Sequence, residues 1–140
     1  MRPLLVAISL FSLALVASAQ SSDEWCPTLP VRESISVAKP VPSPSHPGQK
    51  YLGTVVLLVA ISNRGNVCAV TVASGVDDAL NIDAYNRVRK WKFHPPKKNN
   101  RAVEILAQLD IQYWRNRDGQ TVTVPSSPPE NLREYVRTSQ

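Results

Sequence analysis

The feature that most constrains the fold is an alternating stretch from residue 103 to residue 113. Polar side chains, interrupted only by Leu106, separate its apolar members, which are Val103, Ile105, Ala107, Leu109, Ile111 and Tyr113. Successive side chains of a β-strand point to opposite faces of the sheet. The unbroken period of two therefore predicts a strand that buries one face.

Upstream, residues 53–61 and 67–73 are rich in valine and other apolar residues and predict two antiparallel strands. The turn between them contains Gly65, which tolerates a positive φ angle. The second face of the first strand is less polar than an exposed face should be, which predicts partial cover. The face expected to meet the core holds Val55, Leu57, Val59 and Ile61.

A helix is expected to begin at Asn81, a favourable N-cap residue, and to end near Trp91, before Pro95 and Pro96. The apolar stripe that would cover the sheet consists of Ile82, Tyr85, Val88 and Trp91, together with Ala84, four residues before Val88. We expect Trp91 and Phe93 to belong to the core. Together these elements predict an α+β fold, a small three-stranded antiparallel sheet with one helix packed across a face.

Two segments are expected to precede the domain at residues 50–114. Residues 1–19 combine one arginine, a short apolar run and an Ala-Ser-Ala site, which is the pattern of a cleaved secretory signal. An uncleaved anchor is the alternative, although a spanning helix needs about 20 apolar residues. Residues 20–49 are rich in proline and predict an extended arm. We therefore expect a periplasmic or secreted protein, or an inner-membrane anchored one if the leader is retained.

Residues 115–140 are expected to form a C-terminal extension. Residues 117–119, Arg-Asp-Gly, predict a turn into a possible hairpin strand at residues 120–124. A short terminal helix is expected at residues 131–136.

Cys26 and Cys68 are the two cysteines of the chain, and both lie in the part expected to be exported. An isolated pair in an oxidising compartment predicts a disulfide, with two unpaired thiols as the alternative. The bridge would close a loop of about 43 residues, for which loop-closure entropy gives roughly 4 kcal/mol. The chain contains no Cys-x-x-Cys spacing, so redox and zinc chemistry are not expected.

Charge and composition narrow the kinds of partner. Of the 16 basic residues, loss of Arg2 with the leader leaves 15 against 11 acidic ones, a net charge of +4. This mild excess favours acidic protein patches or lipid headgroups. An exported chain rarely meets nucleic acid, so we expect none as a partner.

Residues 53–75 and 80–95 also carry a specific series of motifs. The helix end is Val-Arg-Lys-Trp-Lys-Phe-His-Pro, residues 88–95, and Leu80-Asn81 stands near the helix start. The remaining members of the series are Gly53, Val55, Leu57, Val59, Gly65, Val67, Val70, Val72, Ser74 and Gly75. This order and spacing resemble the C-terminal domain of the TonB energy transducers. In that family Leu-Asp is usual at the helix start. In this chain Ser45-His46-Pro47 stands where the family has an upstream Tyr-Pro segment.

The resemblance implies a periplasmic protein- or peptide-binding module associated with TonB-dependent transport across the outer membrane. In this family the closing strand lies at the edge of the sheet and pairs with an extended segment of an outer-membrane receptor or another periplasmic protein, a mode called β-augmentation. Two alternatives stay open: residues 120–124 cover the edge, or a second copy pairs there in a homodimer. The expected partner-binding edge consists of Val103, Glu104, Ile105, Leu106, Ala107, Gln108, Leu109, Asp110 and Ile111.

The alternative function is a free-standing exported structural or interaction domain that keeps the fold without energy coupling. A secreted small-ligand or inhibitor protein is a more remote third class. We expect neither a small-molecule substrate nor a cofactor. His46 and His94 have no companion at metal-ligand spacing, and no serine has a nucleophile-elbow pattern, so an enzyme is not expected.

A concentrated run of cations follows the helix. It suggests docking to an acidic partner or an anionic membrane, with a solvated helix face as the alternative. Its members are Arg87, Arg89, Lys90, Lys92, Lys97, Lys98 and Arg101.

Overall fold

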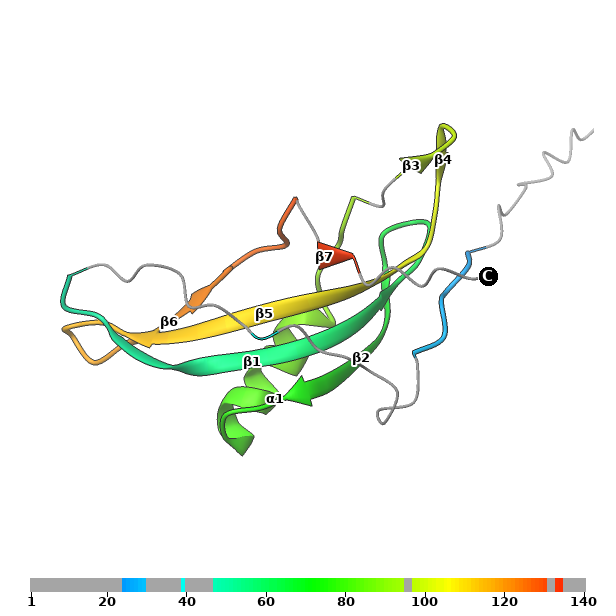
Figure 1. Ribbon diagram of the computed structural model, residues 1–140. Coiled ribbons are helices and arrows are strands. Elements are labelled where there is room, and N and C mark those ends of the chain that lie inside the picture. The colour runs from blue at the N-terminus through cyan, green and yellow to red at the C-terminus, as the bar shows by residue number, and fades with distance from the viewer. Residues whose placement is uncertain (1–23, 30–38, 40–46, 95–96, 131–132, 135–140) are drawn as a thin grey trace, which may run out of the picture.

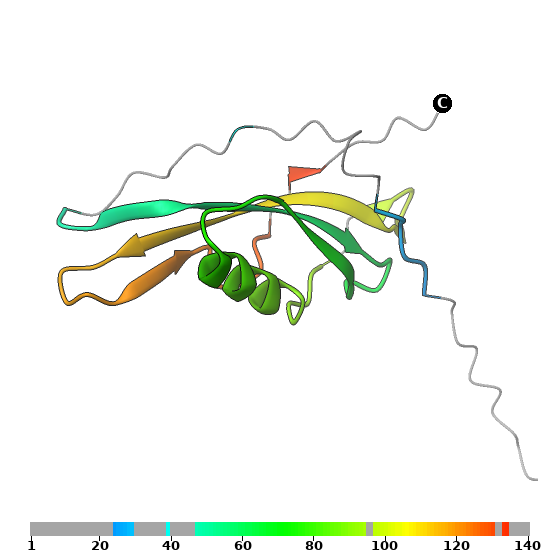
Figure 2. The same cartoon turned by 90° about the horizontal axis from the view of Figure 1, so that it is seen from below.

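The described part of the chain forms a twisted antiparallel sheet with one helix against a face (Figure 1). The structure is a computed structural model that describes residues 24–29, 39, 47–94, 97–130 and 133–134. The expected leader, most of the proline-rich arm and His46 lie outside these residues. Beneath the sheet, α1 lies across it at an angle, as Figure 2 shows from below.

The main sheet has the strand order β2-β1-β5-β6, with β7 also pairing with β5. The bounds are β1 (Lys50–Ile61), β2 (Val67–Ser74), β5 (Ile105–Arg115), β6 (Thr121–Val124) and β7 (Arg133–Glu134). The prediction of an antiparallel sheet with one helix is confirmed. The predicted number of three strands was too low, because the chain turns back after β5 and adds the strands β6 and β7.

The β1–β5 ladder is the longest strand pairing in the sheet. It runs antiparallel from Lys50 opposite Arg115 to Ile61 opposite Ile105, with an irregularity between Tyr51 and Gly53. Gly53 has a φ of 151°, and a Cβ atom there would lie 2.5 Å from a methyl carbon of Val76. Only glycine accommodates both the backbone angle and the close approach.

The helix α1 (Asp78–Val88) begins earlier than the sequence predicted. Asp77 is the N-cap, and its carboxylate accepts a hydrogen bond from the Leu80 amide at 2.8 Å. Asn81, the expected cap, instead lies in the first turn and accepts from the Val76 amide at 2.9 Å. The N-cap prediction was therefore wrong, because an earlier residue caps the first turn and leaves Asn81 to brace the preceding loop.

The face of the helix that meets the sheet also differs in part from the predicted one. Ala84 and Val88 are fully buried, whereas Ile82 is 61% exposed and Tyr85 37% exposed. Ile82 and Tyr85 are therefore not part of the covering stripe, and that prediction was wrong for both.

The core lies between α1 and one face of the sheet. Phe93 is buried in it and Trp91 packs against it partly buried, so both aromatic predictions are confirmed. The rings of these two residues lie 6.0 Å apart. The buried core members are Val55, Leu57, Val59, Ile61, Ala84, Val88, Phe93, Ala107, Leu109, Ile111 and Tyr113.

The opposite face of the sheet is buried as well. Val56 and Ala60 are fully buried and Leu58 is 3% exposed, which confirms that this apolar face is covered. On the same face, β5 contributes Gln108 and Gln112, both buried.

After the helix, β3 (Lys97–Lys98) and β4 (Arg101–Ala102) form a small hairpin. Asn99 and Asn100 form its turn with φ angles of 52° and 62°. Asparagine tolerates these left-handed angles better than other residues with a Cβ atom. The hairpin projects beyond the end of the sheet (Figure 1).

The C-terminal extension follows the prediction only in part. The hairpin strand expected at residues 120–124 is confirmed as β6, and Gly119 takes a φ of 80° in the preceding turn. The short helix expected at residues 131–136 is wrong at residues 133–134, which pair with β5 as the strand β7. The other four positions lie outside the described residues.

Candidate functional site

The strand expected to form the partner-binding edge occupies the interior of the sheet. β5 pairs with β1 along one side and with β6 and β7 along the other. The prediction that β5 is the outermost strand was therefore wrong. The alternative prediction, in which the chain itself covers this strand, holds for the border of β5 opposite β1. We call this second border, along β5 where β6 and β7 pair, the covered border.

The cover of this border is uneven. β6 pairs along Gln112–Arg115, whereas β7 spans two residues and pairs only Ala107 with Glu134 and Gln108 with Arg133. Val103 and Glu104 precede β5, so they are not part of the strand to which the sequence assigned them. Short pairings of this kind contribute little stability by themselves.

Side chains of β5 are fixed by neighbours on both faces. On the face away from α1, Gln108 Nε2 donates to Asp110 Oδ1 at 2.9 Å, and Trp114 Nε1 donates to Gln112 Oε1 at 3.3 Å. The ring of Trp114 lies 4.8 Å from the ring of Tyr51 on β1.

Toward the helix, Tyr113 connects β5 to α1. Its hydroxyl donates to Asp83 Oδ2 at 2.7 Å and lies 3.2 Å from the carbonyl oxygen of Leu80. Burial raises the pKa of Tyr113 well above its ordinary value, and the hydrogen bond to the Asp83 carboxylate raises it further. The hydroxyl therefore stays protonated and acts as a donor.

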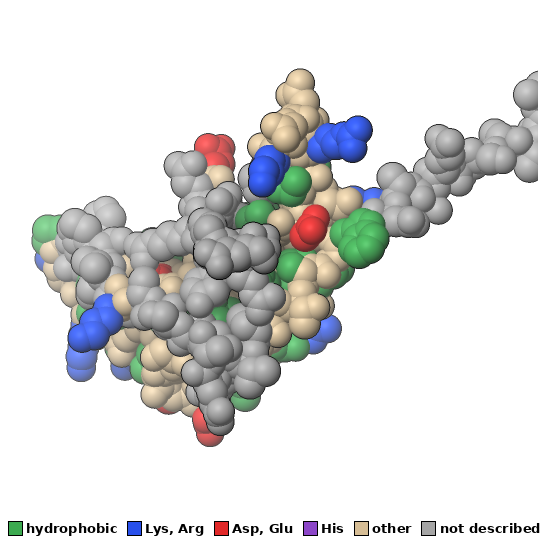
Figure 3. All heavy atoms as spheres, turned by 45° about the vertical axis from the view of Figure 1, so that its right-hand side comes forward, with side chains coloured by type: hydrophobic (Ala, Val, Ile, Leu, Met, Phe, Trp, Pro, Cys, Tyr) green, Lys and Arg blue, Asp and Glu red, His purple; other side chains and the backbone are tan. Residues whose placement is uncertain are grey.

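The predicted basic run is divided between two places. Arg87, Arg89 and Lys90 lie on or next to the C-terminal half of α1, whereas Lys97, Lys98 and Arg101 lie on the β3–β4 hairpin. In Figure 3, Lys and Arg side chains flank the projecting tip.

Contacts within the chain engage two members of the run, Arg89 and Lys92. Arg89 lies over the ring of Tyr85 at 5.7 Å, and Lys92 Nζ donates to Asn66 Oδ1 at 2.6 Å. Docking by these cations to an acidic surface stays a prediction.

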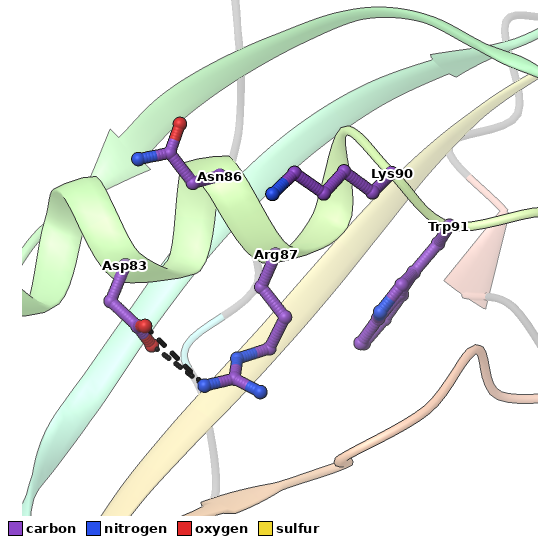
Figure 4. A pocket seen from close by; sticks show the side chains of 5 residues that line it. All are labelled: Asp83, Asn86, Arg87, Lys90 and Trp91. Carbon is purple, nitrogen blue, oxygen red and sulfur yellow. Dashed lines mark hydrogen bonds and ion pairs between the residues drawn. The ribbon is translucent and has the colours of Figure 1, made fainter.

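An open pocket of about 380 Å³ lies beside the C-terminal half of α1. Figure 4 shows Asp83 and Arg87 pointing to the same side of the helix, joined by two contacts of 3.2 and 3.3 Å, with the Trp91 ring beyond them. Sequence reasoning missed this site. The spacing of four between Asp83 and Arg87 was a local signal for the ion pair, but nothing local indicated Tyr113 as a third member.

The N-terminal segment is tied to the turn between β1 and β2. The predicted disulfide between Cys26 and Cys68 is confirmed, with the Cα atoms 6.0 Å apart. Glu24 Oε1 accepts from the Ser62 hydroxyl at 2.7 Å and from Asn66 Nδ2 at 2.6 Å. These two bonds lower the pKa of Glu24, that from Ser62 being the larger cause.

Backbone contacts complete this attachment. The Trp25 amide donates to Asn63 Oδ1 at 3.0 Å, and the Asn63 amide donates to the Trp25 carbonyl oxygen at 3.2 Å. Sequence reasoning did not find these contacts, since they join residues 38 positions apart.

Neither a metal-binding cluster nor a membrane-spanning helix is found in the described residues. Among the residues that the structure describes, no three His, Cys, Asp or Glu side chains gather as ligands of one metal ion. Within the same residues, no helix has the length and hydropathy needed to cross a membrane.

The chain was compared with known proteins. Residues 48–114 match the family model described as Gram-negative bacterial TonB protein C-terminal. No curated protein matches the chain, and no solved structure does. The matched residues include β1, β2, α1 and nearly all of β5, whereas β6 and β7 follow the matched segment.

Proposed function

Because residues 48–114 form a domain of the Gram-negative bacterial TonB protein C-terminal family, we propose that the chain binds an extended segment of an outer-membrane receptor or of another periplasmic protein. The family is periplasmic, non-catalytic and associated with TonB-dependent transport. The binding mode that we propose is strand addition to the covered border of β5.

The observation that carries this proposal is the short pairing of β7. A two-residue strand covers Ala107 and Gln108, whereas β1 engages β5 along its whole length. A longer extended segment that entered at this border would replace few backbone hydrogen bonds and would add new ones. The partner would then gain affinity from the main chain and register from alternate side chains.

Residues beyond the matched segment would act as an internal competitor for the same border. A binding-competent state that is only partly populated lowers the apparent affinity by the populated fraction. Removal of β7 should therefore strengthen binding without any new contact to the partner.

The test uses fluorescein-labelled peptides from periplasm-facing segments of outer-membrane receptors, with fluorescence anisotropy as the measurement. A peptide that binds is then resynthesised with a single N-methyl group at each position in turn. Strand addition predicts that affinity falls at every second position, because only alternate amides of an extended segment face the sheet. Since the protein itself is unaltered, loss of folding cannot produce this alternation.

A deletion series locates the binding border. We expect deletion of residues 131–140 to tighten binding, whereas deletion of residues 137–140, which keeps β7, serves as the matched control and should leave the affinity unchanged. N-methyl groups that are tolerated at all positions would refute strand addition, and tighter binding in both deletions would refute competition by β7.

The second candidate function is a free-standing exported domain that keeps the fold without energy coupling. The cover of β5 within its own chain favours this alternative, since the border is already partly used. Failure of every receptor peptide to bind the protein lacking residues 131–140 would support it. A homodimer through the same border stays a prediction, and sedimentation equilibrium of the full chain tests it.

A further inference from the structure

The pocket beside α1 lies apart from the backbone of β5 and is not used in strand pairing. Its walls are the polar side chains of Asp83, Asn86, Arg87 and Lys90 and the ring of Trp91 (Figure 4). All five belong to α1 or to the turn that follows it. The site is thus set by the helix spacing of three and four residues, and it is independent of whether β7 stays in place.

The guanidinium group of Arg87 is only partly engaged. Its Nη2 atom contacts both oxygens of Asp83, but its Nε atom is buried without a hydrogen-bond partner among the described residues. A buried donor that lacks an acceptor is unfavourable. A small rotation of the side chain toward an incoming oxygen would relieve this, since the guanidinium presents its donors as a planar fork.

The charges around the pocket leave one cation in excess. Asp83 is balanced by Arg87 and is further held by the hydroxyl of Tyr113. Within the described part of the chain, Lys90 has no ion-pair partner. The lining thus carries one net positive charge, which a singly charged anion balances and the second charge of a phosphate exceeds.

We propose that this pocket binds the carboxylate group of a peptide, either a C-terminal carboxylate or the side chain of Asp or Glu. Arg87 and Lys90 donate to the carboxylate oxygens, and Asn86 offers an amide that orients the neighbouring backbone. The half-buried ring of Trp91 packs against the side chain next to the carboxylate. Aromatic and arginine side chains together are the usual anchors of protein recognition.

The test is an NMR titration of the ¹⁵N-labelled full chain, oxidised, with three dipeptide probes and, for comparison, inorganic phosphate. The dipeptides are acetyl-alanyl-phenylalanine with a free carboxylate, the amide of the same dipeptide, and acetyl-glutamyl-phenylalanine amide. We expect the first, the third or both to shift the indole signal of Trp91 and the Nε–H signal of Arg87, and the neutral amide to shift neither. Which acid binds identifies the source of the carboxylate. A dipeptide is too short to add a strand, so failure here is separate from failure of strand addition.

Matched variants decide whether the pocket itself binds. We expect Arg87→Gln to weaken binding about tenfold, and Lys90→Gln about threefold, because the Lys90 ammonium is more exposed. Arg89→Gln makes the same charge change beside the ring of Tyr85, outside the pocket lining, and should leave affinity unchanged. Circular dichroism checks the fold of each variant, and Lys90→Gln keeps the Asp83–Arg87 pair intact.

Three results would overturn the proposal. The first is that neither acid shifts the two signals, and the second is that inorganic phosphate binds as tightly as the acids. The third is an equal loss of affinity in the Arg87, Lys90 and Arg89 variants, which would indicate a general response to charge.

Discussion

Removal of the disulfide between Cys26 and Cys68 tests the contribution of the N-terminal segment to stability. The bridge joins residues 42 positions apart, and both cysteines are exposed. Their replacement by serine therefore removes little buried apolar surface, and the main effect is on the unfolded chain. Loop-closure entropy for a loop of this length gives about 4 kcal/mol.

The measurement is urea unfolding of the oxidised protein, the reduced protein and the variant Cys26→Ser/Cys68→Ser. With a slope of about 2 kcal/mol per molar urea, a loss of 4 kcal/mol lowers the midpoint by about 2 M. Reduced wild-type protein and the double variant should unfold at the same midpoint, because each has lost only the cross-link.

The contacts of Glu24 and Trp25 with the β1–β2 turn decide whether the full effect is seen. If they did not hold the segment in place after reduction, the folded protein would gain chain freedom as well, and the loss of stability would be smaller. A decrease below about 1 kcal/mol on reduction would refute the entropic reasoning, and unequal midpoints for the reduced protein and the double variant would show that serine itself perturbs the fold.

Three further outcomes are expected. Gly53→Ala should lower the free energy of unfolding by about 2–3 kcal/mol in the same urea assay, since it combines a positive φ angle with overlap on Val76. Gly119→Ala, whose Cβ atom would meet no atom within 4 Å, should lower it by about 1 kcal/mol. Tyr113→Phe removes the hydrogen bond to Asp83 and should lower the free energy of unfolding by about 1–2 kcal/mol at neutral pH. Because the pKa of Tyr113 is raised in the folded protein, its contribution to stability is present below the ordinary value of 10.0 and is lost as the pH rises above that value. The urea midpoint of the variant should therefore fall less in alkali than that of the wild type. The carboxyl of Glu24 should titrate below its ordinary value of 4.5 by NMR, and its contribution to holding the segment should disappear as the pH falls through that lowered value; a midpoint at 4.5 or above would contradict the hydrogen bonds from the β1–β2 turn.

The periodicity of the sequence was sufficient to predict the three longest strands, β1, β2 and β5. Alternation in β5 and valine-rich runs in β1 and β2 report directly which face of each strand is buried. The motif at the helix end was equally local, and the cysteine pair was identified by composition and compartment alone. These features depend on residues close together in the chain or on the chemistry of the side chain itself.

Helix capping shows where local reasoning stopped. Both Asp77 and Asn81 are favourable N-cap residues, and the sequence offers no measure of which one will be used. The choice was made by the loop before the helix, because Asn81 is needed to accept from the Val76 amide and Asp77 is free to cap the first turn.

The sequence by itself determined the three longest strands, the faces that they bury toward the core and which cysteines pair. The tertiary structure decided which strand stands next to which, and so changed β5 from an expected edge into an interior strand with a covered border. The physical reason is that side-chain alternation records burial perpendicular to the sheet, whereas the hydrogen bonds that order the strands lie in its plane and involve every residue type alike.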